Sequence, residues 1–306
     1  MSGARLPLVL DLPFAPQVNP NATSLAEPLL RWAREHAALP DRAVAAWRAA
    51  RFDLLVGRMY PQADICLLPV IGRGVLWLFL YDDHLDPGRP GASPAYARRC
   101  AQLAARIVTD PTAQIPSDPL LRALRDVSRQ LRQVGGDSWW RRYAEDLTDF
   151  LESMQHEVST RTAHHMPDLR SYVTARRRTS GWMLLTDLVE LCSGQLPDPT
   201  YRTGLHTRLR EASADVACAV NDLLSLEKEV AAGEVHNQVL IRERQHSCDR
   251  RSARDATLRW MRTRLEDYVR DRDRFPDASY LNGLESLMRG SLDWSMETGR
   301  YSPRSP

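Results

Sequence analysis

Apolar residues recur at intervals of three and four over most of this chain, which is the periodicity of amphipathic helices. The pattern is clear in residues 41–58, 138–160, 168–192 and 201–232, and proline or glycine positions separate these stretches. The alternation of apolar and polar residues that is typical of strands is nearly absent from the sequence. The sequence therefore predicts an all-α protein with about ten helices.

The composition changes little along the 306 residues, and no flexible linker divides them. We therefore expect a single helical domain over residues 1–306. In this interpretation residues 1–20 form an N-terminal segment of the domain, and residues 302–306 form a flexible tail.

The charge of the chain argues against several classes of partner. The 41 Lys and Arg residues nearly balance the 39 Asp and Glu residues, so a role in coating nucleic acid or an anionic membrane is not expected. The longest apolar stretch, Gly74 to Tyr81, is far shorter than the ~20 residues that a transmembrane helix needs. No secretion signal is recognisable. We expect a cytoplasmic protein with no nucleic-acid partner and no membrane-spanning segment.

A group of carboxylates follows this apolar stretch directly. In the segment Asp82-Asp83-His84-Leu85-Asp86, the side chains of Asp82 and Asp86 lie about 40° apart on one helix face. Two carboxylates placed in this way suit Mg²⁺, which prefers oxygen ligands. Because a helix that is apolar on all sides is usually buried, we expect these acids to lie at an interior site and predict that they bind metal.

A second set of oxygen ligands lies downstream. Asn221, Ser225 and Glu229 follow one another at intervals of four, so they span only about 80° of a helix surface. An amide, a hydroxyl and a carboxylate on one face are suitable ligands for a hard cation. Lys228, which lies about 20° from Asn221, is the only lysine in the chain. We predict that it binds a phosphate attached to the metal.

The two motifs resemble those of the class I terpene synthases, specifically the short bacterial enzymes with a single α domain. In that family an Asp-rich motif and an Asn-Ser-Glu triad face each other across the mouth of a helical bundle and hold three Mg²⁺ ions on a substrate diphosphate. The resemblance implies a class I terpenoid synthase-like bundle around a central active-site cavity. It also implies that Asp82 is the principal ligand of two metal ions and Asp86 a lesser one. Asn221, Ser225 and Glu229 are then the ligands of the remaining ion.

The family also has an arginine that senses the diphosphate, shortly before a break in a helix. Arg176, Arg177 and Arg178 precede Ser180 and Gly181 here. The resemblance favours Arg177 as the sensor, since Ser180 and Gly181 then occupy the linker and effector positions of the family. A glycine within a helix costs about 1 kcal/mol relative to alanine, which indicates a functional break at Gly181. Such a break can direct a backbone carbonyl group into the cavity.

The C-terminal Arg300-Tyr301 pair matches a family pair that binds diphosphate as the site closes. The resemblance thus implies four residues that bind the diphosphate. They are Arg177, Lys228, Arg300 and Tyr301.

Aromatic side chains near the motifs are candidates for stabilising a carbocation with their π faces. Phe79 lies about one helical turn before Asp82, and Trp294 precedes Arg300 by six residues; both match aromatic positions of the family. Trp77 and Trp182 are weaker candidates. We expect His84 to have no catalytic part, and the neighbouring His164 and His165 lack a third ligand spaced for zinc.

The resemblance implies a magnesium-dependent terpene cyclase, a carbon–oxygen lyase that acts on a phosphate ester. It would ionise a linear isoprenyl diphosphate, release diphosphate and cyclise the carbocation to a hydrocarbon or an alcohol. Farnesyl diphosphate is the expected substrate. Geranylgeranyl diphosphate comes next, because the chain has only 5 Phe and many candidate lining residues are smaller. A homodimer is also expected from the resemblance.

Three alternatives are less well supported. An isoprenyl diphosphate synthase would have a second Asp-rich motif where the Asn-Ser-Glu triad stands. A helical metallophosphohydrolase would need several metal-binding histidines. A non-catalytic helical interaction protein would explain the helices but not the acids after the apolar stretch, the single lysine or the glycine within a helix.

Overall fold

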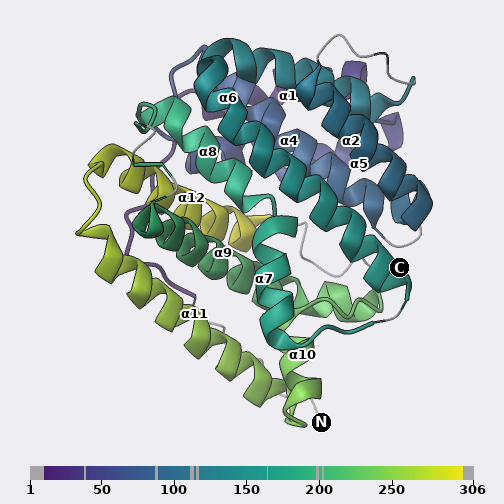
Figure 1. Cartoon of the computed structure of the whole chain (residues 1–306), viewed down its shortest axis with the longest axis vertical. Coiled ribbons are helices and arrows are strands. Elements are labelled where there is room, and N and C mark those ends of the chain that lie inside the picture. The colour runs from purple at the N-terminus through teal and green to yellow at the C-terminus, as the bar shows by residue number, and fades with distance from the viewer. Residues whose placement is uncertain are drawn as a thin grey trace.

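Helices form all the regular secondary structure in the part of the chain that the structure describes. This part of the computed structural model comprises residues 10–298 except 38, 87–88, 111–113, 115–116, 164, 198–199 and 202. The all-α prediction is confirmed (Figure 1). The elements are, in chain order, η1 (Ala22–Leu25), α1 (Ala26–His36), η2 (Asp41–Ala43), α2 (Val44–Ala50), α3 (Phe52–Met59), α4 (Leu67–Leu85), η3 (Pro90–Ala92), α5 (Pro94–Thr109), α6 (Pro119–Thr162), α7 (Leu169–Thr179), α8 (Trp182–Ser193), α9 (Gly204–Ala231), α10 (Gln238–Gln245), α11 (Arg250–Arg272) and α12 (Ala278–Glu297).

Helix α4 contains the apolar stretch and lies inside the bundle. The side chains of Leu68, Ile71, Val75 and Leu76 have no exposed surface. The helix packs against α1, α3, α6 and α8, which cover it on several sides. It ends at Leu85, so the carboxylates of the Asp-rich motif emerge where the buried part of the helix stops. Among the described helices, none is long and apolar enough to cross a membrane.

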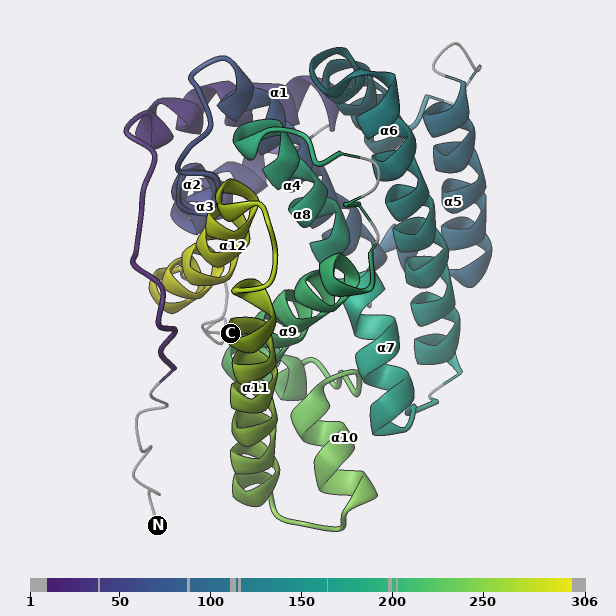
Figure 2. The same cartoon turned by 60° about the vertical axis from the view of Figure 1, so that its left-hand side comes forward.

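Helix α6 is the longest element and supports the cavity from one side. It has 44 residues and is kinked at Gly136, whose φ of 72° lies in the left-handed region that glycine adopts at little cost. Helix α5 packs along it (Figure 2). Gly136 thus bends the helix.

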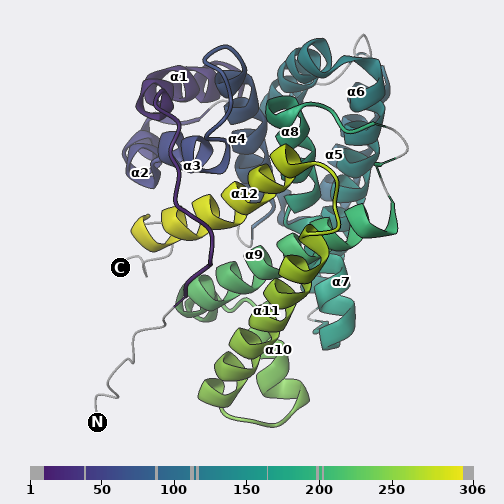
Figure 3. The same cartoon turned by 90° about the vertical axis from the view of Figure 1, so that its left-hand side faces the viewer.

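Helices α11 and α12 both pack against α9. Helix α11 packs along α9, and α12 crosses α3, α8 and α9 (Figure 3). Every residue of α9 from 212 to 220 is buried, so neighbouring side chains surround this part of the helix and hold its rotation about its axis. Residues of the Asn-Ser-Glu triad therefore have a fixed direction relative to the core.

Two of the periodic stretches consist of more than one helix. The stretch 41–58 is interrupted at Arg51, which has a φ of 51°, so α2 and α3 are separate helices. The stretch 168–192 is divided at Gly181, where the sequence predicted a break, and its two parts are α7 and α8. These interruptions explain why the described residues contain twelve α-helices and not about ten.

The close approach of α12 to α3 yields a test of the packing. A Cβ atom on Gly290 would lie 2.5 Å from the carbonyl carbon of Arg58, which is backbone and cannot turn away. We expect Gly290→Ala to cost about 1–3 kcal/mol of unfolding free energy and to lower the melting temperature by several degrees, measured by circular dichroism. In the control Gly204→Ala, the new Cβ would meet only the end of the Arg208 side chain at 3.6 Å. An unchanged melting temperature in both variants would contradict the close packing of α12 on α3.

Candidate active site

A cavity of about 540 Å³ lies between α3, α4, α6, α7, α8, α9 and α12. The lining positions extend from Val75 of α4 to Asp86, the residue after the helix, a rise of about 16 Å. Apolar side chains come first along α4 and along α9, and polar side chains come later on both helices. The cavity therefore has an apolar end and a polar end, and the polar end lies at the C-terminal ends of α4 and α9.

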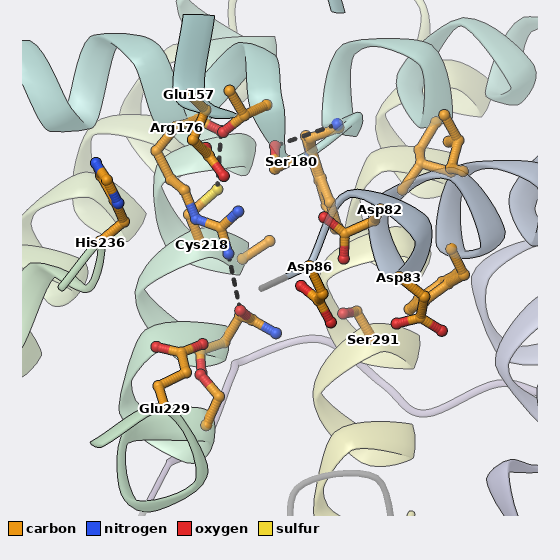
Figure 4. Close-up of a pocket in the computed structure, with 18 of the residues that line it drawn as sticks. Asp82, Asp83, Asp86, Glu157, Arg176, Ser180, Cys218, Glu229, His236 and Ser291 are labelled. Carbon is orange, nitrogen blue, oxygen red and sulfur yellow. Dashed lines mark hydrogen bonds between the residues drawn. The ribbon is translucent and has the colours of Figure 1, made fainter. Parts of the chain in front are cut away.

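Three aspartates from α4 and the residue after it line the polar end. Asp82 and Asp86 are there, as the sequence predicted, and Asp83 joins them. Asp82 is exposed, whereas Asp83 and Asp86 are half-buried. Figure 4 shows the three carboxylates on one side of the cavity, across from Arg176 and Glu229. Asp83 was missed because it is about 100° from Asp82 on an ideal helix, yet the cavity is wide enough to include it.

The Asn-Ser-Glu triad lines the opposite side of the polar end, on α9. The Ser225 hydroxyl donates to the carbonyl of Asn221 at 2.6 Å, and Nδ2 of Asn237 donates to Oε2 of Glu229 at 2.8 Å. Burial, with a further contribution from the neighbouring Asp222, raises the pKa of Glu229 to about 7. Lys228 also lines the cavity, so the structure brings together all the predicted metal ligands and this predicted diphosphate ligand.

Arg176 is the arginine that faces the cavity from α7. Its Nη2 atom donates to Oδ1 of Asn221 at 2.8 Å, and its Nε atom lies 3.5 Å from Oδ1 of Asp222. Asp222 is 1% exposed and accepts hydrogen bonds from the Tyr172 hydroxyl at 2.8 Å and the Gln238 backbone N–H at 2.9 Å. This buried carboxylate therefore holds Arg176 towards the triad.

The sequence predicted that Arg177 faces the cavity, and this prediction is wrong by one position: Arg176 faces the cavity instead. Arg177 makes two hydrogen bonds to Asp215, of 2.7 and 2.8 Å, and also pairs with Glu211. It lines a separate cavity of about 450 Å³ on the other side of α7. The reason is that Asp215, which is 1% exposed, needs cationic partners and takes both Arg177 and Arg264. Asp215 and Asp222 lie about two turns apart on α9. Asp215 pairs with Arg177, and Asp222 pairs with Arg176.

The predicted break lies at Gly181, which has a φ of 68° and is the N-cap residue of α8. Ser180 and Trp182, on either side of it, line the main cavity, whereas Gly181 borders the separate cavity beside Arg177. The carbonyl of Gly181 accepts the N–H of Leu185 at 3.2 Å, the first hydrogen bond of α8. The break thus turns the chain at the cavity wall. A catalytic role for Gly181 stays a prediction.

Aromatic side chains line the apolar end. The rings of Phe79 and Trp294 are 5.8 Å apart in a T-shaped arrangement, and the indole N–H of Trp294 donates to the carbonyl of Ala50 at 2.6 Å. Trp182 lines the cavity as well, and so does Phe150, which the sequence did not single out. These aromatic faces border the space that the hydrocarbon part of a ligand would occupy.

The structure places the candidate Trp77 away from this wall, and His84 as well. Trp77 is a core residue, because its ring stacks on Tyr81 with the centroids 5.1 Å apart and its N–H donates to the carbonyl of Leu120. His84 contacts the Tyr96 hydroxyl at 3.0 Å and does not line the cavity. The predicted diphosphate ligands Arg300 and Tyr301, and the tail 302–306, lie outside the described residues.

The donor atoms at the polar end fit a hard divalent cation. The carboxylates of α4 and the amide, hydroxyl and carboxylate of α9 all offer oxygen, which Mg²⁺ prefers. In the described ranges, no three side chains of the types His, Cys, Asp and Glu are placed to hold one metal ion. A cation at this end would therefore need Asn221, Ser225 and the oxygen atoms of its ligand, unlike the histidine-rich site of a metallophosphohydrolase.

Comparisons with known proteins agree with this arrangement. A family model described as terpene synthase family 2, C-terminal metal binding, matches residues 74–267. Pristinol synthase of Streptomyces pristinaespiralis is 29% identical over 95% of this chain and 84% of that enzyme. A (+)-T-muurolol synthase of Roseiflexus castenholzii, described as cyclising farnesyl diphosphate, is 28% identical over 96% and 93% of the two chains. The crystal structure of a-eudesmol synthase has a TM-score of 0.84 at 23% identity, over 95% of this chain and 100% of that chain.

The matched residues include both motifs, from the aspartates that end α4 to the triad of α9. The structural likeness confirms the predicted type of helical bundle. The family model also covers more than half of the chain. The protein therefore belongs to terpene synthase family 2, which confirms the resemblance that its two motifs indicated.

Proposed function

We propose that this protein is a magnesium-dependent class I terpene cyclase that ionises and cyclises farnesyl diphosphate, with geranylgeranyl diphosphate as the second candidate substrate. The observation that carries the proposal is the division of one cavity into a polar end with cation ligands and an apolar end with aromatic walls. The (+)-T-muurolol synthase, whose name specifies that it cyclises farnesyl diphosphate, supports the shorter substrate.

The polar end would hold the diphosphate. Three Mg²⁺ ions, held by Asp82, Asp86 and the triad, would neutralise the charge that develops on the leaving group. Arg176 and Lys228 would bind the diphosphate oxygens, Arg176 taking the part first expected of Arg177. We propose that Arg300 and Tyr301 add further hydrogen bonds. These groups would accelerate ionisation because they bind the departing anion more strongly than the intact ester.

The apolar end would fold the isoprenyl chain and protect the carbocation. The faces of Phe79, Trp182 and Trp294 carry a negative quadrupole that favours a nearby cation. The aliphatic side chains around them would exclude water, which would otherwise end the reaction early. The break at Gly181 would direct backbone dipoles of the α7–α8 turn towards the reacting carbon.

Several broader expectations accompany the proposal. We propose that residues 1–306 form one domain, that the protein works in the cytoplasm and that it forms a homodimer. An isoprenyl diphosphate synthase is less well supported, because the segment from Asn221 to Glu229 lacks the second Asp-rich motif. A non-catalytic interaction protein would leave the cavity and its two ends without a purpose.

The proposal is tested by incubating the purified protein with Mg²⁺ and, separately, geranyl, farnesyl and geranylgeranyl diphosphate. Organic extracts are analysed by gas chromatography with mass detection. We expect a cyclic product from farnesyl diphosphate that is lost when EDTA removes the metal. When isopentenyl diphosphate is added as well, a longer linear diphosphate in the aqueous phase, detected by liquid chromatography, would identify a synthase. Three unchanged substrates would contradict the cyclase.

The assignment of the two arginines predicts opposite behaviour of two matched variants. Arg176→Gln removes a cation from the polar end, so we expect kcat/KM to fall by roughly 10²–10³, as when one donor to a developing anion is lost. Arg177→Gln leaves the buried Asp215 with Arg264 alone, so we expect a lower melting temperature and a much smaller loss of activity. Steady-state kinetics and thermal melts on both variants decide which of the two arginines binds the diphosphate. The reverse pattern would restore Arg177 as the diphosphate ligand.

The raised pKa of Glu229 predicts that metal binding depends on pH. Because this pKa of about 7 exceeds the ordinary 4.5, the folded protein retains a proton that Mg²⁺ must displace. We expect the half-saturating Mg²⁺ concentration, measured by calorimetry with inorganic diphosphate, to increase as the pH falls below 7, towards about tenfold per pH unit. Above pH 8 it should change little. Glu229→Gln should bind Mg²⁺ more weakly and lose this dependence, and an unchanged dependence in that variant would assign the proton to another group.

A further inference from the structure

We propose that Arg161 is a positioning residue that holds the C-terminal ends of α4 and α9 in one geometry, so that the two metal motifs bind Mg²⁺ as a unit. Arg161 lies near the end of α6 and belongs to neither motif. Its side chain, together with Glu157 and Glu234, lines the polar end of the cavity. The inference deepens the proposed function and rests on it.

The first contact of Arg161 is with the end of α4. Its Nη2 atom donates to the carbonyl of Leu85 at 2.7 Å. Leu85 is the last residue of α4, and carbonyl groups in the last turn of a helix have no partner within the helix. A guanidinium at this position satisfies one such carbonyl and interacts favourably with the negative end of the helix dipole.

This contact bears directly on the aspartates. Asp86, the next residue, leaves the helix with a ψ of 152°. The direction of its carboxylate therefore depends on where α4 ends. By binding the carbonyl of Leu85, Arg161 fixes that end from the neighbouring helix α6.

The second contact of Arg161 is with the segment after α9. Its Nη1 atom lies 3.4 Å from Oε2 of Glu234, and the two side chains are 17% and 13% exposed. Although burial opposes it, hydrogen bonds from His236 and from the Val235 backbone lower the pKa of Glu234 to about 2. Glu234 is therefore an ionised partner near neutral pH, and the pair is largely removed from solvent.

Glu234 in turn closes the end of α9. Its backbone N–H donates to the carbonyl of Glu229 at 2.9 Å, and Gly233, with a φ of 72°, supplies the left-handed residue that such a helix end requires. Asn237, three residues further on, holds the Glu229 carboxylate at 2.8 Å. The segment that Arg161 binds is thus the segment that orients the last ligand of the triad.

One guanidinium consequently connects both motifs. Each motif lies in the last turns of its helix, where a helix is least constrained by its own hydrogen bonds. The planar fork of Arg161 reaches the α4 end with one nitrogen and the α9 end with another. A lysine has one nitrogen in place of the two that make these contacts, so it can reproduce the geometry only in part. Arg161 therefore acts through other residues and needs no contact with substrate.

The test measures the half-saturating Mg²⁺ concentration by calorimetry, in the presence of inorganic diphosphate, and again in turnover. We expect Arg161→Gln to raise it roughly tenfold, the usual cost of losing a group that orients metal ligands. Glu234→Gln should raise it as well, and the double variant should be no worse than Arg161→Gln because the pair acts as a unit. Arg161→Lys should recover only part of the loss. At saturating Mg²⁺, kcat should stay within about threefold of the wild-type value.

The control is Arg132→Gln in the same helix, which removes an exposed pair with Asp137 and should leave Mg²⁺ binding unchanged. Circular dichroism and thermal melts establish that each variant folds, and if Arg161→Gln does not, Arg161→Lys and Glu234→Gln carry the test. The inference would be overturned if the half-saturating Mg²⁺ concentration of these variants stayed within about twofold of the wild-type value. It would also be overturned if the double variant showed the product of the two single effects. If the wild-type protein nevertheless forms a terpene, only the inference about Arg161 fails and the proposed function stands. If the wild-type protein binds neither Mg²⁺ nor diphosphate, the inference and the proposed function both fail.

Discussion

The polar end of the cavity depends on the interactions of the buried Asp222 carboxylate. This carboxylate has almost no contact with solvent, and it accepts hydrogen bonds from Tyr172 of α7 and from the backbone of Gln238 in α10 while it faces Arg176. A carboxylate buried in such a place is costly without partners, so the three helices that supply them have little freedom to move apart. The positive charge that faces the aspartates of α4 is therefore held in place by a residue that does not itself line the cavity.

The parts of the site that could be predicted from sequence are those that lie on one helix. The spacing of the triad places its members on one face of α9. The apolar stretch of α4 requires burial. Both motifs, and the cavity that they face, could therefore be predicted. The break at Gly181 was also predicted, because a glycine within a helical pattern is costly without a purpose. The all-α fold was predicted from apolar periodicity, and the structure confirms it.

The parts that could not be predicted depend on contacts between helices. Consecutive arginines look alike in a sequence, and only the positions of the buried acids on α9 decide that Arg176 faces the cavity and Arg177 faces away. The interruption at Arg51 has no glycine or proline to mark it. Arg161 is equally inconspicuous, since its two partners come from segments 76 and 73 residues away in the chain. Such features arise from tertiary packing, which local patterns do not record.

The close packing of α12 on α3 has a consequence for how such a cavity diversifies. Gly290 brings the two backbones together at the wall that carries Trp294, so this wall cannot shift inwards or outwards as a rigid body without breaking the contact. Changes in the contour of the cavity must then come from exchanging individual lining side chains. A scaffold of this kind can evolve new products by small steps while its folding remains untouched. The two relatives described above are each less than a third identical to this chain and carry the names of different products, in keeping with that history.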